Sequence, residues 1–390
     1  MSKAERFRGK ERDITIEVLR IIACLMVIVT HVKLGMTSSQ MPDRRRILIT
    51  VLSGDGVSLF WCILGCFYFR GRKRYSKLLK RTFFDIGIPM ILFCVILFWF
   101  GGFLFGGVSL AQSLAHSAQE WKDLVVRGIL GGYCVIPRTD HLWYLMVYFL
   151  VILLYPALWG AKHYFFPDGD DRGGRPAVWV FAAVFFGILV INDITGNALL
   201  SIRHQGLGGV AGAVPMMVLG AVLYDRRKCF TKNLKAGVLG VMLLTAVCLL
   251  WMQAEYTWLL ADLTYETRQC RICGFGYVKM AAMFLIAFGF SGYLKAGEKL
   301  KKVLLHLGRL TFYIYLVHFP MLTFLDRSGV RGRAEALLNG SAVGEFLYPT
   351  VLAVCLLIFT IPVAELFLVA ERVVRKRLNL RHSRYYERKH

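Results

Sequence analysis

Long apolar runs, separated by short polar connections, make up most of the chain. Each run is close to the ~20 residues that a helix needs to cross a bilayer, and lipid offers the backbone no other hydrogen-bonding partner. The pattern therefore predicts an all-α polytopic membrane bundle of about ten transmembrane helices. The predicted spans are 14–34, 47–69, 83–107, 141–160, 176–193, 208–224, 235–253, 272–293, 303–325 and 345–371.

Two of these runs differ from the others in length and composition. The runs 176–193 and 208–224 are the shortest, and they carry Gly and Pro residues such as Gly212 and Pro215. Such residues are common where membrane helices are broken or tilted beside cavities. We therefore expect breaks or tilts in these two spans.

Basic residues are distributed unevenly between the two sides of this arrangement. The connections on one side, together with both termini, carry 32 Lys and Arg residues, and those on the other side carry 12. The positive-inside rule therefore predicts that both termini are cytoplasmic. We expect one integral membrane domain over 1–390, in which 1–13 is a cytoplasmic segment and 372–390 is a basic cytoplasmic tail.

Composition agrees with a membrane protein, since 56% of the residues are hydrophobic, 19% are charged and the mean hydropathy is +0.53. Most of the net charge of +23 lies in short clusters beside the spans. Anionic lipid headgroups are the ordinary partner of such clusters, so the charge does not indicate nucleic acid. The densest cluster, 70–81, either binds lipid alone or also holds the phosphates of an anionic cytoplasmic substrate.

Two ionisable residues stand out in the first predicted span. Arg20 and His31 are eleven residues apart, which places them on nearly the same helix face and about 16 Å apart along the axis. Ionisable side chains inside a span are costly and usually functional, so the pair indicates a polar path. Glu17 can pair with Arg20, which leaves His31 to exchange a proton. In the alternative interpretation, Arg20 snorkels to the inner headgroups and His31 rests at the outer interface.

Other polar residues lie in or beside later spans. His141 opens the fourth span from the outer side, where the neighbouring aromatic residues fit an interfacial belt that does not require a histidine. Tyr315 and His318 share a face of the ninth span, which fits either internal hydrogen bonding or a site. Lys279 and Glu365 are further charges within spans for which the sequence indicates no partner.

The remaining patterns carry little chemistry. No phosphate-binding, dinucleotide-binding or metalloprotease motif is present, and no metal site is predicted. Most of the ten cysteines lie within spans as small apolar residues. Cys134, Cys270 and Cys273 are predicted to be external, where a disulfide is an open alternative. The amphipathic stretch 115–130 predicts a helix on the outer surface.

Four segments follow one another in a recognisable order. Glu17, Arg20 and His31 form an acidic–Arg–ten residues–His pattern, and 56–65 is an apolar stretch that ends in Gly. The segment 141–145 reads His-Leu-Trp-Tyr-Leu, and 313–318 reads Tyr-Ile-Tyr-Leu-Val-His. Together they resemble the membrane-bound type-3 acyltransferase family of bacterial multi-span O-acyltransferases, and the resemblance covers essentially the whole chain.

The chain departs from that family's pattern at two points. Leu64 stands where the family usually has Ser, just before Gly65. Asp85 stands where a second Arg is expected near Arg81, ahead of the proline of the third span. Lys77 and Lys80 are candidates to replace that arginine.

The resemblance implies transfer of an acyl group, most often acetyl, from cytoplasmic acyl-CoA to a hydroxyl presented outside the bacterial inner membrane. The acceptor would be a carbohydrate or a lipid-linked envelope molecule. It implies His31 as the catalytic residue, either as general base or as acyl carrier. Acetyl-CoA would be bound by Arg20, Lys77, Lys80 and Arg81, and the supporting residues would be Glu17, His141, Tyr315 and His318.

Two alternatives stay open at the level of sequence. A transporter or flippase for a polar envelope precursor would also line its path with intramembrane charges. A succinyltransferase of the same family would use a longer donor. Membrane lipids are expected partners in every case, nucleic acid is not, and the sequence leaves the oligomeric state open.

Overall fold

The computed structural model describes residues 12–34, 43–126, 136, 138–165, 206–260, 274–293, 297–338 and 342–377. Every regular element in these ranges is a helix. Six of the described helices are long and apolar enough to cross a membrane, or seven when one bent pair counts as a single span. The chain is therefore a multi-pass helical membrane protein. The predicted span 176–193 lies outside the described residues, and the total of ten spans and the cytoplasmic location of the termini stay predictions.

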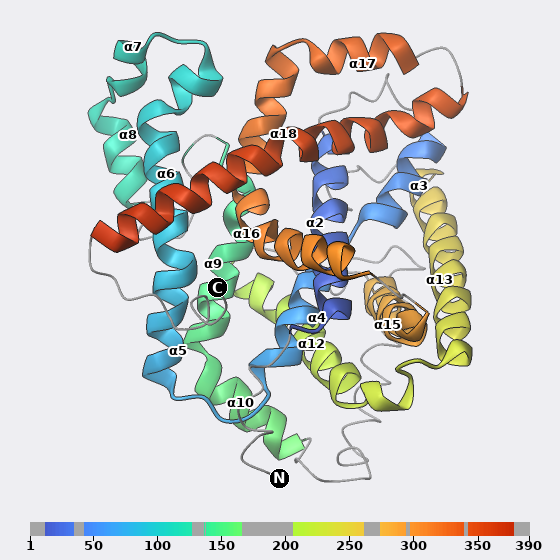
Figure 1. Cartoon of the computed structure of the whole chain (residues 1–390). Coiled ribbons are helices and arrows are strands. Elements are labelled where there is room, and N and C mark those ends of the chain that lie inside the picture. Colours follow the sequence, from blue (N-terminus) through green and yellow to red (C-terminus); the bar gives the residue numbers. More distant parts are fainter. Residues whose placement is uncertain are drawn as a thin grey trace.

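The described helices include α-helices and short 3₁₀ and π segments. Their bounds are α2 Ile14–Leu34, α3 Asp43–Ser53, α4 Gly56–Tyr68, α5 Tyr75–Thr82, η1 Phe83–Gly87, α6 Ile88–Gly101, η2 Gly102–Gly106, α7 Leu110–Leu114, α8 Ala118–Asp123, η4 Asp140–Leu142, α9 Trp143–Leu153, α10 Tyr155–Phe165, α12 Gly206–Asp225, η5 Arg227–Cys229, α13 Leu234–Leu260, α15 Gly274–Gly289, η6 Phe290–Gly292, α16 Glu298–Arg327, α17 Val330–Leu338 and α18 Ala342–Arg377. Figure 1 shows α2 in the interior of this bundle, with the long α5–α6 helix and the α13–α15 pair at opposite edges.

Helix α2 is the central element, and it packs against α4, α16 and α18. Its apolar side chains Ile16, Leu19, Ala23, Ile28 and Val32 are almost completely buried. In a membrane protein a helix that is apolar on most faces and surrounded by other helices lies inside the bundle. The polar residues of α2 therefore face protein neighbours, which is why each of them has a specific environment.

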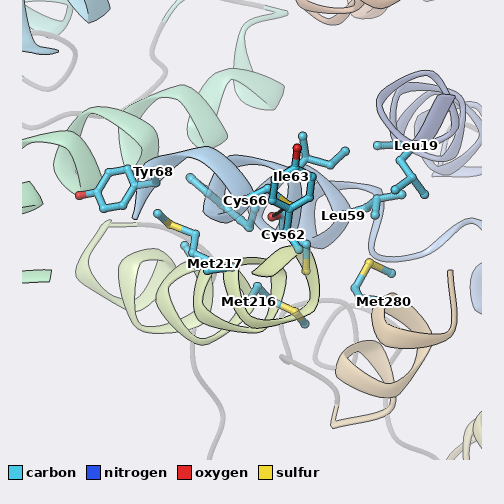
Figure 2. Close-up of a cluster of buried hydrophobic side chains, with 14 of the residues drawn as sticks. Leu19, Leu59, Cys62, Ile63, Cys66, Tyr68, Met216, Met217 and Met280 are labelled. Atoms are coloured by element: carbon cyan, nitrogen blue, oxygen red, sulfur yellow. Dashed lines mark hydrogen bonds between the residues drawn. The ribbon is translucent and has the colours of Figure 1, made fainter. Parts of the chain in front are cut away.

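Helices α4 and α12 approach closely because each places a glycine against the other's backbone. A Cβ added to Gly65 would lie 1.9 Å from the carbonyl oxygen of Met217, and one added to Gly220 would lie 2.0 Å from that of Cys62. Figure 2 shows the buried side chains that fill the space around this contact. Small residues at such crossings let membrane helices come within backbone contact. The expected break in the run 208–224 is absent, because α12 continues as one helix through Pro215.

The second apolar run divides into α3 and α4 at Gly54 and Asp55, where Asp55 adopts a left-handed conformation with φ 66°. Lys279 of α15 reaches this break, and its ammonium donates hydrogen bonds to the carbonyls of Val51, Leu52 and Gly54 at 2.6, 3.0 and 2.9 Å. The buried lysine thus satisfies carbonyls that the end of α3 leaves without helical donors. Glu365, the other charge without an assigned partner, lies against His306.

The fourth predicted span, 141–160, is not one straight helix. It consists of α9 and α10, which are bent by 69° relative to each other. Pro156 explains the bend, because its ring has no N–H for the carbonyl of Ile152 and clashes with a regular helical turn. The third span also differs from its predicted bounds, since the continuous helix begins at Tyr75 rather than at residue 83. Part of the basic cluster 70–81 is therefore helical.

The segment after the third span contains the short helices α7 and α8. Ser117 caps α8 in a reciprocal arrangement with Glu120, so this helix begins at Ala118. Only 118–123 of the predicted helix 115–130 belongs to α8, and 127–130 lie outside the described residues. Cys134, Cys270 and Cys273 also lie outside them, so the disulfide alternatives stay open.

Candidate active site

Three histidines that are far apart in the sequence lie together inside the bundle. His31 comes from α2, His141 from the short η4 turn that precedes α9, and His318 from the middle of α16. Their ring centroids are 4.9 Å apart for His141–His318, 5.1 Å for His31–His318 and 6.4 Å for His31–His141. The packing of α2 against α16 brings two of these rings together, and η4 delivers the third.

Phe319 completes this group, and we call His31, His141, His318 and Phe319 the histidine cluster. The Phe319 ring stacks on His141 at 5.4 Å and meets His31 edge-on at 5.4 Å. His141 and His318 are 2% and 0% exposed, whereas His31 is partly exposed. His31 is therefore the most exposed of the three histidines.

Hydrogen bonds from one turn of α16 orient the two buried rings. His141 Nε2 lies 3.1 Å from the carbonyl oxygen of Leu316, and His318 Nδ1 lies 2.7 Å from that of Tyr315. A carbonyl oxygen only accepts hydrogen bonds, so both of these ring nitrogens carry the proton. The Tyr315 hydroxyl donates in return to the main-chain carbonyl of His141, which connects η4 and α16 in both directions.

Arg20 lies on the same continuous helix as His31 and forms an ion pair with Glu17. Its Nη1 is 3.0 and 3.1 Å from the two carboxylate oxygens of Glu17, and Arg12 lies 3.6 Å from the same carboxylate. Glu17 is buried, whereas 26% of the Arg20 side chain is exposed. The carboxylate thus holds Arg20 in place and leaves about a quarter of its side chain accessible, which suits an anion-binding residue.

Two tyrosines of α9 lie in the region between the basic residues and the histidine cluster. Tyr148 lies close to Thr82 and within the electrostatic reach of Arg20, Arg81 and Asp85. One turn away, the Tyr144 ring lies 4.5 Å from Trp61 and 5.7 Å from Tyr315. These contacts form a series of polar and aromatic side chains from Arg81 to the cluster. No pattern in the sequence indicates a role in a site for either tyrosine.

The expected donor-binding lysines are placed differently from Arg20. Lys77 and Lys80 are exposed on α5, and no hydrogen bond or ion pair of the described residues joins either of them to Arg20. Arg81 is also exposed and pairs with Asp85 at 3.3 Å. Asp85 stands where a second arginine was expected, and it is the ion-pair partner of Arg81 one helical turn earlier.

Lys73 is a further basic residue at this end of the bundle. Its Nζ donates to the carbonyl of Phe67 at 2.7 Å. Partial burial, together with the charge of Arg81, lowers its pKa from 10.5 to about 8. Its position in a dense basic cluster was the only sequence signal for this behaviour.

The chemical capacity of the site rests on imidazole, hydroxyl and guanidinium groups. Among the described residues, no group of three or more His, Cys, Asp or Glu side chains is arranged to hold a metal ion. The arrangement offers a proton acceptor at His31, fixed rings beside it, and a cation at Arg20 on the same helix, about 16 Å away along the axis. An imidazole of this kind can take a proton from a hydroxyl or act as a nucleophile, so the site suits group transfer.

Comparison with known proteins agrees with this chemistry. The model of the type-3 acyltransferase family, described as an acyltransferase domain, matches residues 13–368. The match includes α2, η4 and α16 and so contains every residue of the histidine cluster. Searches of curated proteins and of solved structures found no match.

Proposed function

The chain belongs to the type-3 acyltransferase family, and from this premise we propose that it transfers an acyl group from cytoplasmic acyl-CoA to a hydroxyl on the outer side of the membrane. Acetyl-CoA is the proposed donor. The proposed acceptor is a carbohydrate or another cell-envelope molecule. Membership of the family supports acyl transfer in general, and the donor, the acceptor and the direction of transfer are the finer parts of the proposal.

The position of His31 carries this proposal. It is the partly exposed member of a cluster whose other two histidines are buried and hydrogen-bonded to α16. Arg20 lies eleven residues earlier on the same helix, about 16 Å away along the axis. Coenzyme A has an anionic nucleotide end and a long arm that ends in the thioester. A cation and a base separated along one helix face suit such a molecule.

In the proposed transfer step, the proton moves from the acceptor hydroxyl through His31 to the departing sulfur. The acceptor hydroxyl gives its proton to His31 as its oxygen attacks the thioester carbonyl. The C–O bond of the ester forms, the C–S bond breaks, and the proton passes from His31 to the departing sulfur, so that coenzyme A leaves as a free thiol. In the covalent alternative, a His31 ring nitrogen attacks the thioester carbonyl, the C–S bond breaks and coenzyme A leaves as the thiolate. The acceptor oxygen then attacks the acyl group, the N–C bond to His31 breaks, and the hydroxyl proton ends on the coenzyme A sulfur.

Donor entry is proposed at the end of the bundle where Arg81 lies. Tyr148 is within reach of both Arg81 and Arg20, and Tyr144 continues the series of side chains toward Tyr315. The nucleotide phosphates would bind to Arg81 and to the exposed Lys77 and Lys80. The deeper part of the donor would contact Arg20. When the donor binds, Arg81 would either leave Asp85 or contact Asp85 and a donor phosphate together.

Calorimetric binding of acetyl-CoA to the purified protein in detergent tests the donor. We expect saturable binding by the wild type and a loss of roughly tenfold to a hundredfold in Arg20→Ala, since a hydrogen-bonded charge contributes about 1.5–3 kcal/mol. Arg81→Ala should weaken binding less, because that side chain is exposed. Arg226→Ala, which removes another exposed arginine, is the matched control and should bind normally. A folded wild type that binds no acyl-CoA would contradict the proposal and favour a transporter.

The catalytic role of His31 is tested by measuring the release of coenzyme A and the transfer of labelled acetyl. His31→Ala should bind acetyl-CoA and insert normally but transfer nothing. His306→Ala is the control, because His306 pairs with Glu365 away from the cluster. Normal transfer by His31→Ala would reject the mechanism. Preference for succinyl-CoA over acetyl-CoA in competition would change the donor and keep the mechanism.

A further inference from the structure

The two buried histidines each have one ring nitrogen that carries no proton. His141 uses the proton on Nε2 for the Leu316 carbonyl, and His318 uses the proton on Nδ1 for the Tyr315 carbonyl. A neutral imidazole has only one N–H. Nδ1 of His141 and Nε2 of His318 are therefore hydrogen-bond acceptors in the neutral rings.

Neither acceptor meets a donor among the described residues. Both atoms are fully buried and without a hydrogen-bond partner. A buried polar atom of this kind is costly unless a ligand or water supplies the missing group. The two rings are neighbours at 4.9 Å, and His31 lies 5.1 and 6.4 Å from them. Two unsatisfied acceptors thus stand beside the proposed base.

We propose that His141 Nδ1 and His318 Nε2 accept hydrogen bonds from hydroxyls of the acceptor that neighbour the hydroxyl attacking at His31. This inference rests on the proposed function and deepens it, because it assigns two residues to recognition of the acceptor. Each hydroxyl has one hydrogen to donate, so the acceptor presents two hydroxyls beside the attacking one, as a sugar ring does. A simple alcohol, whose one hydroxyl gives its proton to His31, would leave both nitrogens without a donor.

The protonation of the rings excludes two other uses for them. The oxygen of a tetrahedral intermediate is an anion that needs hydrogen-bond donors, and these two nitrogens have none to give. A carboxylate or phosphate of the acceptor is likewise an acceptor only and would be repelled there. The subsite therefore selects hydroxyl groups over acidic groups on the acceptor carbons next to the one that carries the attacking hydroxyl.

Two substitutions remove the unprotonated nitrogens, His141 Nδ1 and His318 Nε2, and keep the hydrogen bonds to α16. His141→Gln retains an N–H at the position of Nε2 for the Leu316 carbonyl and has no acceptor at the position of Nδ1. His318→Asn retains an N–H at the position of Nδ1 for the Tyr315 carbonyl and lacks Nε2. Because each variant keeps the contact that orients the side chain, loss of folding is not the expected result.

The experiment compares cis,cis-1,2,3-cyclohexanetriol with cyclohexanol as acceptors for acetyl from labelled acetyl-CoA. With the wild type, kcat/KM should be higher for the triol by about tenfold to a hundredfold, the usual effect of leaving a buried partner unpaired. In each variant kcat/KM for the triol should fall toward that for cyclohexanol, while KM for acetyl-CoA stays unchanged. Equal use of the two alcohols by the wild type overturns the inference. A changed KM for acetyl-CoA with intact triol preference also overturns it and assigns the nitrogens to the donor's amide groups.

Nitrogen-15 NMR of histidine-labelled protein provides a readout that does not depend on activity. Bare and protonated ring nitrogens resonate separately, so the spectrum reports which nitrogen of each ring carries the proton. Addition of the triol should shift the resonances of the two unprotonated nitrogens, which His141→Gln and His318→Asn identify by their absence. Unchanged resonances reject the subsite. Absence of coenzyme A release under any condition instead rejects the proposed function itself.

Discussion

Pro320 lies one helical turn after Leu316 in α16, and its ring nitrogen has no hydrogen to donate to the Leu316 carbonyl. His141 of the η4 turn donates to this carbonyl instead, from Nε2 at 3.1 Å. A proline inside a membrane helix is tolerated when a neighbouring group satisfies the freed carbonyl. The proline and the histidine thus depend on each other, and the orientation of the His141 ring follows from the sequence of another helix.

Pro320→Ala should separate stability from activity. Alanine restores the main-chain N–H, which competes with His141 for the Leu316 carbonyl. Since proline costs a helix interior about 3 kcal/mol relative to alanine, the variant should be at least as stable as the wild type in thermal unfolding. Its transfer rate should nevertheless fall, because the His141 ring loses its fixed orientation.

Pro362→Ala provides the control for that measurement. Pro362 also lies inside a helix, α18, but it is exposed and outside the histidine cluster. This variant should gain or keep stability with unchanged transfer. If Pro320→Ala transfers acetyl as fast as Pro362→Ala, the freed carbonyl has no role in orienting His141.

Gly308 of α16 lies directly against the carboxylate that holds Arg20. A Cβ at this position would lie 2.1 Å from Glu17 Oε2, so Gly308→Ala must displace either the carboxylate or the helix. We expect lower thermal stability and weaker binding of acetyl-CoA, because Arg20 loses its fixed partner. Gly332→Ala is the control, since a Cβ there meets nothing within 4 Å. Wild-type stability and donor affinity in Gly308→Ala would show that α2 and α16 are less tightly packed at this point.

The main features of the fold were predictable from local patterns. Apolar length and the pattern of Arg20 and His31 on one helix face are properties of neighbouring residues, and α2 is one continuous helix over Ile14–Leu34. The bend between α9 and α10 was also accessible, since Pro156 stands inside the predicted span. In contrast, Pro215 does not break α12, so proline alone did not identify the bend.

The composition of the site was not predictable in the same way. His31, His141 and His318 meet only because α2, η4 and α16 converge, and no sequence spacing encodes that convergence. The three carbonyls bound by Lys279 belong to a helix end more than 200 residues earlier in the chain. Pro320 in the sequence indicates that the Leu316 carbonyl lacks a helical donor, but nothing in the sequence indicates that His141 is the donor that replaces it.

Lys279→Met should destabilise the fold through the break between α3 and α4. Methionine has a similar length and no donor, so the carbonyls of Val51, Leu52 and Gly54 lose the hydrogen bonds of the ammonium. Leaving buried acceptors unsatisfied costs about 1–3 kcal/mol each, so a clear fall in the unfolding temperature in detergent is expected. Lys235→Met at an exposed position of α13 should have little effect. Equal unfolding temperatures for the two variants would contradict a structural role for Lys279.

Lys73 should make stability depend on pH above neutrality. Burial and the charge of Arg81 lower its pKa to about 8 in the folded protein, against 10.5 for an ordinary lysine. Between these two values, the unfolded chain still binds the proton that the folded protein has released. Unfolding therefore takes up a proton, and stability rises with pH across this window.

Thermal unfolding of the wild type and Lys73→Met at pH 8 and pH 10 checks this prediction. The unfolding temperature of the wild type should rise relative to that of Lys73→Met between the two pH values, because only the wild type carries the perturbed amine. Lys77→Met removes an exposed lysine of the same cluster, and its pH profile should parallel that of the wild type. A profile of Lys73→Met that also parallels the wild type would mean that Lys73 titrates as an ordinary surface lysine. In that case its ammonium would still be charged at pH 8 and would add one more cation to the proposed donor entrance.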